Sequence, residues 1–485
     1  MKKLYILSYL LYFIFSCSFA QTTFETLIKN NNDEYVFDIQ ELDSAYFLCG
    51  KSKDANTNLF TPLLIKISNS GTVIKRLVFD NHLMDFQKGL LLKAASGNFI
   101  FYGYAYKTLP YSKRIYIFFA EFNSELDTIW TSWWPVLTND EILSFRTVIL
   151  NNRNFGFFIT KRPAESKKKT YLLLYEFSQT GQLVSTKSTR VPHGGKIQNI
   201  FVNPDSINTY SLISTDFGSY VQLNILNPEL NLMFLKEFIT PVRDNITVKK
   251  YFDKYYFSGY LHFTLEEKYQ FYSAVLDDYL DSLKTSVFGK DDLINDYPAL
   301  YRSLDFISEN SIYFGATTNM VNPPGLIYNN TWFMLHKTDS DLNPLWTKWY
   351  GGNAYYEMFC ILATNDSGCL MAGNKIDLNT NYLIRNIYLL KVDENGTFTG
   401  IDYYHIKQEQ LISIYPNPGR NQLTITNNTK NLYFELFDIT GKILLKKFIP
   451  AYSTEVNVSH LRKGVYFYRI YDNKNIIKTG KWVKQ

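Results

Sequence analysis

Residues 24–50 read FETLIKNNNDEYVFDIQELDSAYFLCG, and residues 346–373 read WTKWYGGNAYYEMFCILATNDSGCLMAG. The two stretches align: an outer apolar strand, a polar loop, a second apolar strand, a turn, and an apolar run that closes on a glycine. In this alignment residues 24–28 stand where residues 346–350 stand, although they precede the first complete repeat. We therefore expect residues 24–28 to form the outermost strand of the last repeat, so that both ends of the chain close one ring.

The same pattern recurs along the chain. Apolar runs end at Gly50, Gly103, Gly259, Gly315 and Gly373. Two degenerate copies, GFFIT ending at Thr160 and TYSLI ending at Ile213, fill the longest gap and give seven copies at a period of about 55 residues. Each copy reads as four short strands joined by turns such as SNSG, SQTG and DENG. This repeat predicts an all-β fold, a seven-bladed β-propeller over residues 22–404.

The composition agrees with a β fold and excludes some functions. Among 485 residues there are 38 Tyr and 37 Phe, which favour pleated, half-buried strands. The net charge of +5 comes from cations and acids that are interspersed, without a dense basic block. The sequence therefore predicts no nucleic-acid partner. Beyond the first twenty residues we expect no transmembrane segment, because no stretch is long and apolar enough.

The first twenty residues have the three parts of an export signal. Lys2 and Lys3 precede the apolar run LYILSYLLYFIF, and small residues follow up to Ala20. We interpret residues 1–20 as a signal peptide that is cleaved after Ala20. An acylated Cys17 is the less favoured alternative, because Phe15 is too large for a lipoprotein signal.

Three cysteines remain after that cleavage. Cys49 lies in an apolar strand pattern, where a small buried thiol is the ordinary interpretation. Cys360 and Cys369 flank the hairpin turn ATNDSG, so a cross-strand disulfide between them stays open.

The repeat stops after residue 404. The polar segment 405–411 reads as a linker, and residues 412–485 read as a second domain. Alternating apolar residues in NLYFELFD and GVYFYRIYD predict half-buried strands of a small Ig-like β-sandwich. Prolines at Pro416 and Pro418 would stop the preceding strand.

This second domain resembles the C-terminal sorting domain of type IX secretion substrates of Bacteroidota over its whole length. The residues that carry the resemblance are Tyr415, Pro416, Asn417 and Pro418 at the start, Gly441 in FDITGK, Gly464 in LRKGVYFYRI, and a Lys-rich end. The resemblance implies recognition by the outer-membrane translocon, and an extracellular or outer-membrane surface location. An ordinary sandwich that serves only packing is the alternative. The repeat region, through WTKWYGG, resembles the blades of large secreted propellers of the same bacteria, which implies a fold but no defined activity.

Motifs for chemistry are absent from the sequence. The six His residues occur singly, and no HExxH, GxSxG, P-loop or zinc-type cysteine pair occurs. Two loops place oxygen ligands at alternate positions, namely Asp54, Asn56 and Asn58, and Asp377, Asn379 and Asn381. They lack the glycine and the distal glutamate of a calcium loop, so polar hairpin loops are the favoured interpretation. The sequence predicts no metal site and no cofactor.

Charged residues fall in or beside the predicted inner strands. They are Asp38, Arg146, Lys249, Arg302, Asp305 and Glu357. The three cations would make the mouth of a central channel favour an anionic ligand. We therefore favour a binding or adhesion module for a polysaccharide or a protein, with Arg146, Lys249, Arg302, Asp38 and Glu357 as candidate ligand-binding residues and no catalytic residue.

Two other classes of function stay open. A secreted glycosidase or lyase would need acids that converge only in three dimensions, since nothing in the sequence pairs two carboxylates. A structural part of a surface or gliding apparatus would show a large apolar patch on its exterior.

Overall fold

The computed structural model describes residues 22–398 and 413–485. It leaves out residue 44 and the segments 80–83, 95, 110–111, 137–139, 164–168, 192–194, 216–217, 239–246, 264–267, 278–280, 290–294, 321–328, 381–382, 428–431, 451 and 473–475. The expected signal peptide 1–20 and linker 405–411 lie outside the described residues. All regular structure in the described part is β-strand, which confirms the all-β prediction, and no helix there is long and apolar enough to cross a membrane.

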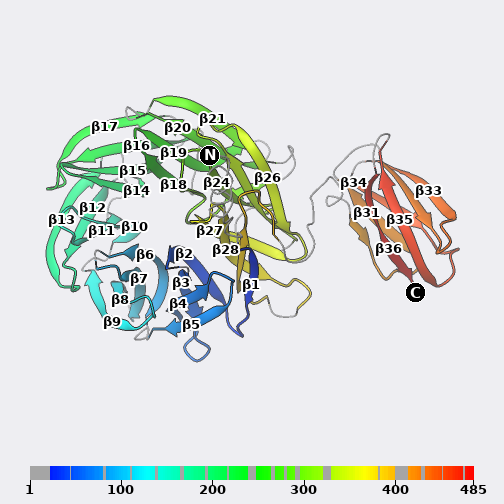
Figure 1. Cartoon of the computed structure of the whole chain (residues 1–485), viewed down its shortest axis with the longest axis horizontal. Helices are drawn as coiled ribbons and strands as arrows, with labels where there is room; N and C mark the ends of the chain where they lie inside the picture. Colours follow the sequence, from blue (N-terminus) through cyan, green and yellow to red (C-terminus); the bar gives the residue numbers. More distant parts are fainter. Residues whose placement is uncertain are drawn as a thin grey trace, which may run out of the picture. The chain divides into compact units, whose positions relative to one another are not determined.

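The chain divides into two compact units, the second of which includes the residues from Tyr404 onward. The described part of the first unit holds seven antiparallel sheets (Figure 1). In chain order, the first sheet consists of β2 (Glu34–Leu42), β3 (Ala45–Lys53), β4 (Phe60–Ser68) and β5 (Val73–Val78), and the second consists of β6 (Asp85–Lys93), β7 (Phe99–Leu109), β8 (Ser112–Phe122) and β9 (Thr128–Val136). The third sheet consists of β10 (Glu141–Ile149), β11 (Phe155–Arg162), β12 (Thr170–Phe177) and β13 (Leu183–Val191), and the fourth consists of β14 (Lys196–Asn203), β15 (Ser206–Thr215), β16 (Gly218–Leu226) and β17 (Leu232–Phe238). The fifth sheet consists of β18 (Thr247–Tyr251), β19 (Lys254–Phe263), β20 (Lys268–Leu276) and β21 (Ser282–Phe288).

The sixth and seventh sheets differ from the simple up-and-down order. The sixth consists of β22 (Asp296–Pro298), β23 (Leu304–Phe306), β24 (Ile312–Thr318), β25 (Trp332–Thr338) and β26 (Pro344–Gly351), and its short strands β22 and β23 both pair with β24. The seventh consists of β27 (Tyr355–Ala363), β28 (Cys369–Ile376), β29 (Asn386–Val392) and β1 (Phe24–Ile28). Figure 1 shows the sheets following one another around a central space, with β2, β6, β10 and β18 towards the inside.

The N-terminal strand closes the ring as predicted. β1 pairs antiparallel with β29, from Phe24 opposite Lys391 to Ile28 opposite Ile387. It is therefore the outermost strand of the sheet that contains Cys369 and Gly373. The Thr26 hydroxyl also donates to the carbonyl of Gly71 in the first sheet, at 2.7 Å. Because the first strand completes the last sheet, the ring can open only if these contacts break.

One turn recurs in all seven sheets. The side chain of its first residue accepts the backbone N–H of the residue four positions later, at 2.5–3.1 Å. These first residues are Ser68, Asn123, Ser178, Asn227, Asp277, Asp339 and Asp393. In three of the turns a leucine takes the left-handed conformation, as at Leu126 with φ 57°. Its side chain is buried, and this burial offsets the strain.

The repeated glycines are largely, but not wholly, equivalent. Gly50, Gly103, Gly259 and Gly373 occupy the same position, because each faces the residue that lies five positions before the first residue of the recurring turn. Gly315 lies one residue earlier. The corresponding positions in the third and fourth sheets are Ile159 and Ser211, so the expected run ends at Thr160 and Ile213 were wrong by one and two residues. Both sheets lack the glycine that would have marked the register.

The glycines allow a close backbone approach. A Cβ at Gly50 would lie 1.9 Å from the carbonyl oxygen of Tyr35, and one at Gly373 would lie 1.9 Å from that of Glu357. In both sheets the inner strand bulges next to this point, at Phe37 and Phe359. The bulge brings the inner strand so close to its neighbour that only glycine fits.

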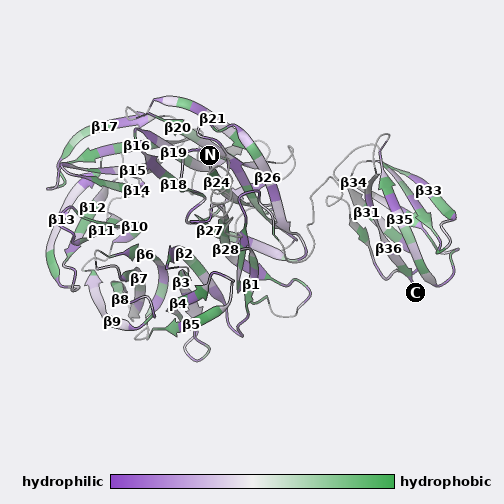
Figure 2. Ribbon diagram, in the orientation of Figure 1, coloured by the Kyte–Doolittle hydropathy of each residue, from purple (hydrophilic) through white to green (hydrophobic). Residues whose placement is uncertain are grey.

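The outer strands mix hydrophobic and hydrophilic residues (Figure 2). Large apolar side chains are exposed at one to three positions of β5, β9, β13, β17, β21 and β26, including Ile74, Ile129, Val184, Met233, Leu283 and Leu345. Scattered exposure of this kind is normal for a folded domain.

The second unit is a small β-sheet domain with its own core. One sheet contains β30 (Ser413–Tyr415), β31 (Gln422–Asn427) and β34 (Tyr452–Asn457), and the other contains β32 (Leu432–Phe437), β33 (Ile443–Ile449), β35 (Gly464–Tyr471) and β36 (Ile476–Lys484). Leu423 and Ile425 from the first sheet and Phe434 and Trp482 from the second belong to one buried cluster. The two sheets thus share one hydrophobic core.

Candidate functional site

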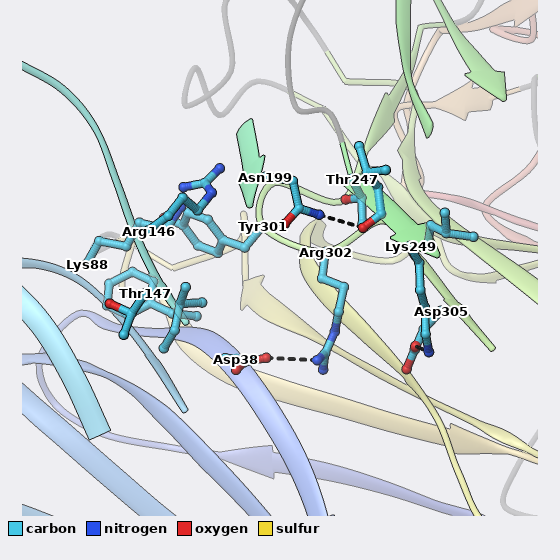
Figure 3. Close-up of a pocket in the computed structure, with 14 residues that line it drawn as sticks. Asp38, Lys88, Arg146, Thr147, Asn199, Thr247, Lys249, Tyr301, Arg302 and Asp305 are labelled. Atoms are coloured by element: carbon cyan, nitrogen blue, oxygen red, sulfur yellow. Dashed lines mark hydrogen bonds and ion pairs between the residues drawn. The ribbon is translucent and has the colours of Figure 1, made fainter. Parts of the chain in front are cut away.

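The inner strands of the first unit surround a cavity of about 310 Å³ (Figure 3). Its lining comes from β2, β6, β10, β14 and β18 and from the inner segment of the sixth sheet. The charged residues among the lining are Asp38, Lys88, Arg146, Lys249, Arg302 and Asp305, and the others are Phe37, Leu90, Thr147, Asn199, Thr247, Val248, Tyr301 and Leu304. The structure thus brings together four of the five residues predicted from sequence as a ligand site.

Asp38 is buried and holds three elements together. Its carboxylate lies 3.1 Å from the Arg302 guanidinium and accepts the N–H of Ile39 at 2.9 Å. It also accepts the N–H of Leu91, in the inner strand of the second sheet, at 3.1 Å. These three contacts fix the position of the carboxylate inside the ring. Asp38 therefore has a structural role as well as a place on the cavity wall.

Asp305 repeats this arrangement between the sixth and seventh sheets. Its carboxylate forms an ion pair with the Lys249 ammonium and accepts the N–H of Ala363 at 2.9 Å. Lys249 also donates to the carbonyl of Phe306, at 2.6 Å. Both acids of the cavity wall are thus engaged with a cation and with the backbone of the next sheet.

Arg302 connects three sheets. Besides the ion pair with Asp38, its guanidinium donates to the carbonyls of Ile39 and Ile361, both at 2.7 Å. Burial alone would lower the pKa of Arg302, but the charges of Asp38 and Asp305 outweigh this and raise it. The residue therefore keeps its charge and binds the ring together from inside.

Tyr301 and Arg302 reach the cavity through an insertion in the sixth sheet. Where the inner strands β2, β6, β10, β14 and β27 each have a one-residue bulge, the sixth sheet has residues 299–303 between β22 and β23. The N–H of Tyr301 donates to the carbonyl of Phe359 at 2.8 Å, and the N–H of Ile361 donates to that of Arg302 at 3.0 Å. The insertion is thus held against β27.

One further cation, Lys88, faces the ring of Tyr301. The Lys88 ammonium lies 4.4 Å from the centre of this ring, within the range of a cation–π contact. Arg146, from β10, also lines the cavity (Figure 3). The Arg146 guanidinium donates to the carbonyl of Phe145 at 2.9 Å, and its charge opposes the burial that raises the pKa of Tyr104 to about 12. Phe37 packs edge-on against Tyr301 at 5.2 Å and supports it.

Glu357, the fifth residue predicted from sequence, is not among the described residues that line this cavity. It lies in β27, three residues before Cys360, and its side chain is buried. Burial raises the pKa of Glu357 to about 7, although the nearby charge of Arg385 lowers it. The carboxyl group therefore titrates near neutral pH.

Sequence reasoning missed Lys88, Asn199 and Tyr301. The signal for Lys88 and Asn199 was present, because each directly follows the bulge of its inner strand, as Asp38 does in β2. Aligning inner strands on that position would have found both. Tyr301 lies in the insertion, which has no counterpart in the other sheets.

The candidate cation loops and the cysteines have local roles. The Asp54 carboxylate accepts the N–H groups of Asn56 and Thr57 at 2.7 and 2.9 Å, and that of Asp377 accepts the N–H of Asn379 at 2.9 Å. These acids cap their own loops, as polar hairpin loops require, whereas Asn381 lies outside the described residues.

Cys49, Cys360 and Cys369 are buried free thiols, and Cys369 faces Ala363 rather than Cys360.

The motif at the start of the second unit is attached to its last strand. The Asn417 side chain donates to the carbonyl of Lys481 at 2.7 Å and accepts the N–H of Val483 at 3.0 Å. The Trp482 indole donates to the carbonyl of Pro416 at 2.9 Å. Gly441 takes a φ of 83° in a turn that Asp438 caps, and Gly464 begins β35. The motif residues therefore join the first and last parts of this unit.

Comparison with known proteins accounts for the second unit. Residues 413–485 match the secretion system C-terminal sorting domain. The match supports a type IX sorting domain at the C-terminus, which implies secretion to the cell exterior or surface and interaction with the secretion machinery. No curated protein matches the chain.

Several solved structures resemble the first unit. The β-propeller domain of the Trilobed protease from Pyrococcus furiosus has 9% identity and a TM-score of 0.41, over 78% of this chain and 100% of that one. An ulvan lyase of a polysaccharide lyase family has 8% identity and a TM-score of 0.42, over 76% and 96%. An acylaminoacyl peptidase from Pyrococcus horikoshii has 11% identity and a TM-score of 0.40, over 81% and 57%. At this level of similarity, their activities do not transfer to this chain.

Proposed function

We propose that the protein is a secreted or cell-surface binding protein of Bacteroidota. A signal peptide at residues 1–20 directs it to the periplasm, and residues 412–485, an Ig-like sandwich, direct it through the type IX translocon. The seven sheets are the blades of a β-propeller that presents a ligand site, for a polysaccharide or a protein, at its centre. Export rests on the family match of residues 413–485.

The observation that supports binding is the central cavity and its charged wall. Its volume of about 310 Å³ lies at the lower end of the range for small-molecule sites. Asp38 and Arg302 hold the wall rigid, so a ligand would meet a preorganised surface. Of the residues predicted from sequence, Arg146 and Lys249 are the ones we assign to ligand contact.

Removal of residues 412–485 tests the export part of the proposal. We expect the truncated protein to accumulate in the periplasm of a type IX-competent host, because the translocon no longer recognises it. Fractionation and immunoblotting would measure this, with the full chain as the control. Surface delivery of the truncated protein would contradict the assignment.

A glycan array, together with capture of host surface proteins, tests the binding part. We expect the purified full chain to retain a defined ligand at neutral pH. The same glycans should also be incubated with the protein and screened for hydrolysis and for elimination. If no ligand is retained in any of these assays, the proposed function is wrong.

A carbohydrate-active enzyme is the second candidate. Such an enzyme needs carboxylates that face the substrate, and the acids on the described cavity wall are Asp38 and Asp305. Turnover in the screen that is lost in Asp305→Asn and kept in Glu229→Gln, at an exposed site, would support this candidate.

A further inference from the structure

We propose that the sorting domain docks on a protein of the secretion machinery through the outward side of its four-stranded sheet, β33-β32-β35-β36 (Figure 1), and that this partner offers an apolar surface with acidic groups at its edge. The proposal rests on the proposed export function and adds to it the surface and the chemistry of the partner. The outer face, as we call it, carries Tyr433, Phe437, Ile443, Phe448, Val465 and Phe467.

The register of the sheet places these side chains on one side. In β32 the even-numbered residues from Leu432 to Leu436 belong to the buried core. The odd-numbered residues therefore point outward. Phe437 lies opposite Ile443 of β33 and opposite Phe467 of β35, and residues that face each other across an antiparallel pair share a side.

The outer face is exposed although it is apolar. Ile443, Phe448, Val465 and Phe467 are 40–48% exposed, and they lie on two strands on either side of β32. Several large apolar side chains on one side of one small sheet form a patch, unlike the scattered exposure on the outer strands of the first unit. Such a patch is typical of an interaction surface.

The other sheet of the same domain provides an internal comparison. In it Gln422 lies opposite Asn457 and Thr424 lies opposite Glu455, on the side away from the core. These four side chains are polar, as expected for an antiparallel sheet with one face in water. Contact with water therefore explains the outward side of this sheet but not that of the outer face.

The charged groups in the middle of the outer face are engaged with one another. The buried Glu435 carboxylate accepts the Arg469 guanidinium at 2.6 Å and the Tyr471 hydroxyl at 2.8 Å, and it lies 3.1 Å from the Lys446 ammonium. An apolar partner can cover such a satisfied network without leaving a charge alone. Lipid head groups would first have to break these contacts, so the arrangement favours a protein over a membrane surface.

The aromatic rings of the outer face are held in place. Tyr433 stacks on Tyr471 with ring centres 5.6 Å apart and packs edge-on against Phe448 at 5.5 Å. The Arg469 guanidinium lies 5.1 Å from the ring centre of Phe437. A partner therefore meets a surface whose side chains are already ordered.

Cations lie at the edge of the outer face. Residues 413–485 contain 12 Lys and Arg against 4 Asp and Glu, whereas the whole chain has 50 against 45. Lys481 lies opposite Phe467, and Lys442 and Lys463 directly precede β33 and β35; all three are exposed. These cations favour a partner with acidic groups around its apolar contact, and they disfavour a second copy of the same basic domain.

The family match supports a protein of the secretion machinery as the occupant. A sorting domain implies interaction with that machinery. The outer face is the part of this domain whose apolar side chains the domain itself does not cover.

Photocrosslinking in a type IX-competent host tests the location of the contact. One full chain carries p-benzoylphenylalanine in place of Phe467, and the matched control carries it in place of the exposed Gln422 on the other sheet. After irradiation of intact cells we expect position 467 to crosslink to a protein of the outer-membrane translocon, identified by mass spectrometry. Position 422 should give no such product.

Export of full-chain variants tests the contribution of the contact. Phe467→Ser and Phe448→Ser should each lower the exported fraction about tenfold, because a buried aromatic contact with the partner is lost. Gln422→Ser and Asn457→Ser should stay within about twofold of the wild type. Lys481→Glu should lower export about threefold or more, and Lys481→Arg should not, because the edge of the partner is acidic.

Folding is checked separately. Thermal melts of the purified full-chain variants should lie within about 3 °C of the wild type, because the changed side chains are largely exposed. If a serine variant unfolds, the crosslinking test still decides, because p-benzoylphenylalanine keeps an aromatic ring at position 467.

The remaining outcomes separate the docking face from export itself. The proposal is wrong if position 467 crosslinks only to a second copy of the chain, to lipid or to no translocon protein, or if both serine variants are exported like the wild type. If removal of residues 412–485 blocks export in the same host while these variants do not, export by the domain stands and only the docking face falls. If the truncated chain is exported, the proposed function falls as well.

Discussion

The carboxyl group of Glu357 should make the stability of the first unit depend on pH. Burial raises its pKa from 4.5 to about 7 in the folded protein. The folded state therefore binds the proton more tightly, and this stabilisation is fully present below pH 4.5 and is lost as the pH rises through about 7. The loss amounts to roughly 3 kcal/mol at most.

Denaturant unfolding of the wild type and of Glu357→Gln between pH 5 and pH 8 measures this effect. The difference in unfolding free energy between the two should grow with pH in favour of the variant, because glutamine never acquires the charge. Glu229→Gln, at an exposed site, should follow the wild type at every pH. Parallel curves for the wild type and Glu357→Gln would contradict the prediction.

A methyl group at Gly50 should destabilise the first sheet. Its Cβ would lie 1.9 Å from the carbonyl oxygen of Tyr35, so the inner strand must move. We expect Gly50→Ala to cost about 3 kcal/mol or more in unfolding free energy. Gly97→Ala is the matched control, because no atom lies within 4 Å of a Cβ added at Gly97. The φ of 86° at this residue is the only source of strain for the added methyl group. It should cost about 1 kcal/mol, and equal losses would show that steric contact is not the reason.

At the scale of elements, β1 should be essential for closing the ring. Proline at Thr26 removes a backbone N–H in the middle of the strand that pairs with β29. We expect Thr26→Pro to lower the unfolding free energy by about 3 kcal/mol. Thr26→Val keeps the backbone and loses only the hydrogen bond to Gly71, so about 1 kcal/mol is expected. A proline variant as stable as the valine variant would mean that the ring holds without this strand.

The elements also show where alignment of the sequence succeeds. The position of β1 in the last sheet could be predicted by aligning residues 24–50 with residues 346–373, because both stretches have the sequence pattern of the same repeat. The register of the third and fourth sheets did not follow, because Ile159 and Ser211 replace the glycine. The insertion at residues 299–303 could not be seen, because it occurs in a single sheet.

At the scale of the whole molecule, the two units should fold independently. Each has buried clusters of its own, and the C-terminal cluster draws on residues from Leu423 to Trp482. We expect the chain without residues 412–485 to melt within about 3 °C of the first transition of the full chain. Calorimetry of both proteins measures this. A large drop in melting temperature would show that the second unit stabilises the first.

The sequence by itself determined the strand repeat, the closure by residues 24–28 and the sorting domain, because apolar periodicity, turn residues and motif order are local properties. Only the tertiary structure decided which charged residues meet. Asp38, Arg146, Lys249 and Arg302 come from four different sheets and share one cavity, whereas Glu357 lies outside its lining. The physical reason is that a one-residue bulge or an insertion changes which side chains of an inner strand face the centre, and such shifts depend on pairing with the neighbouring strand.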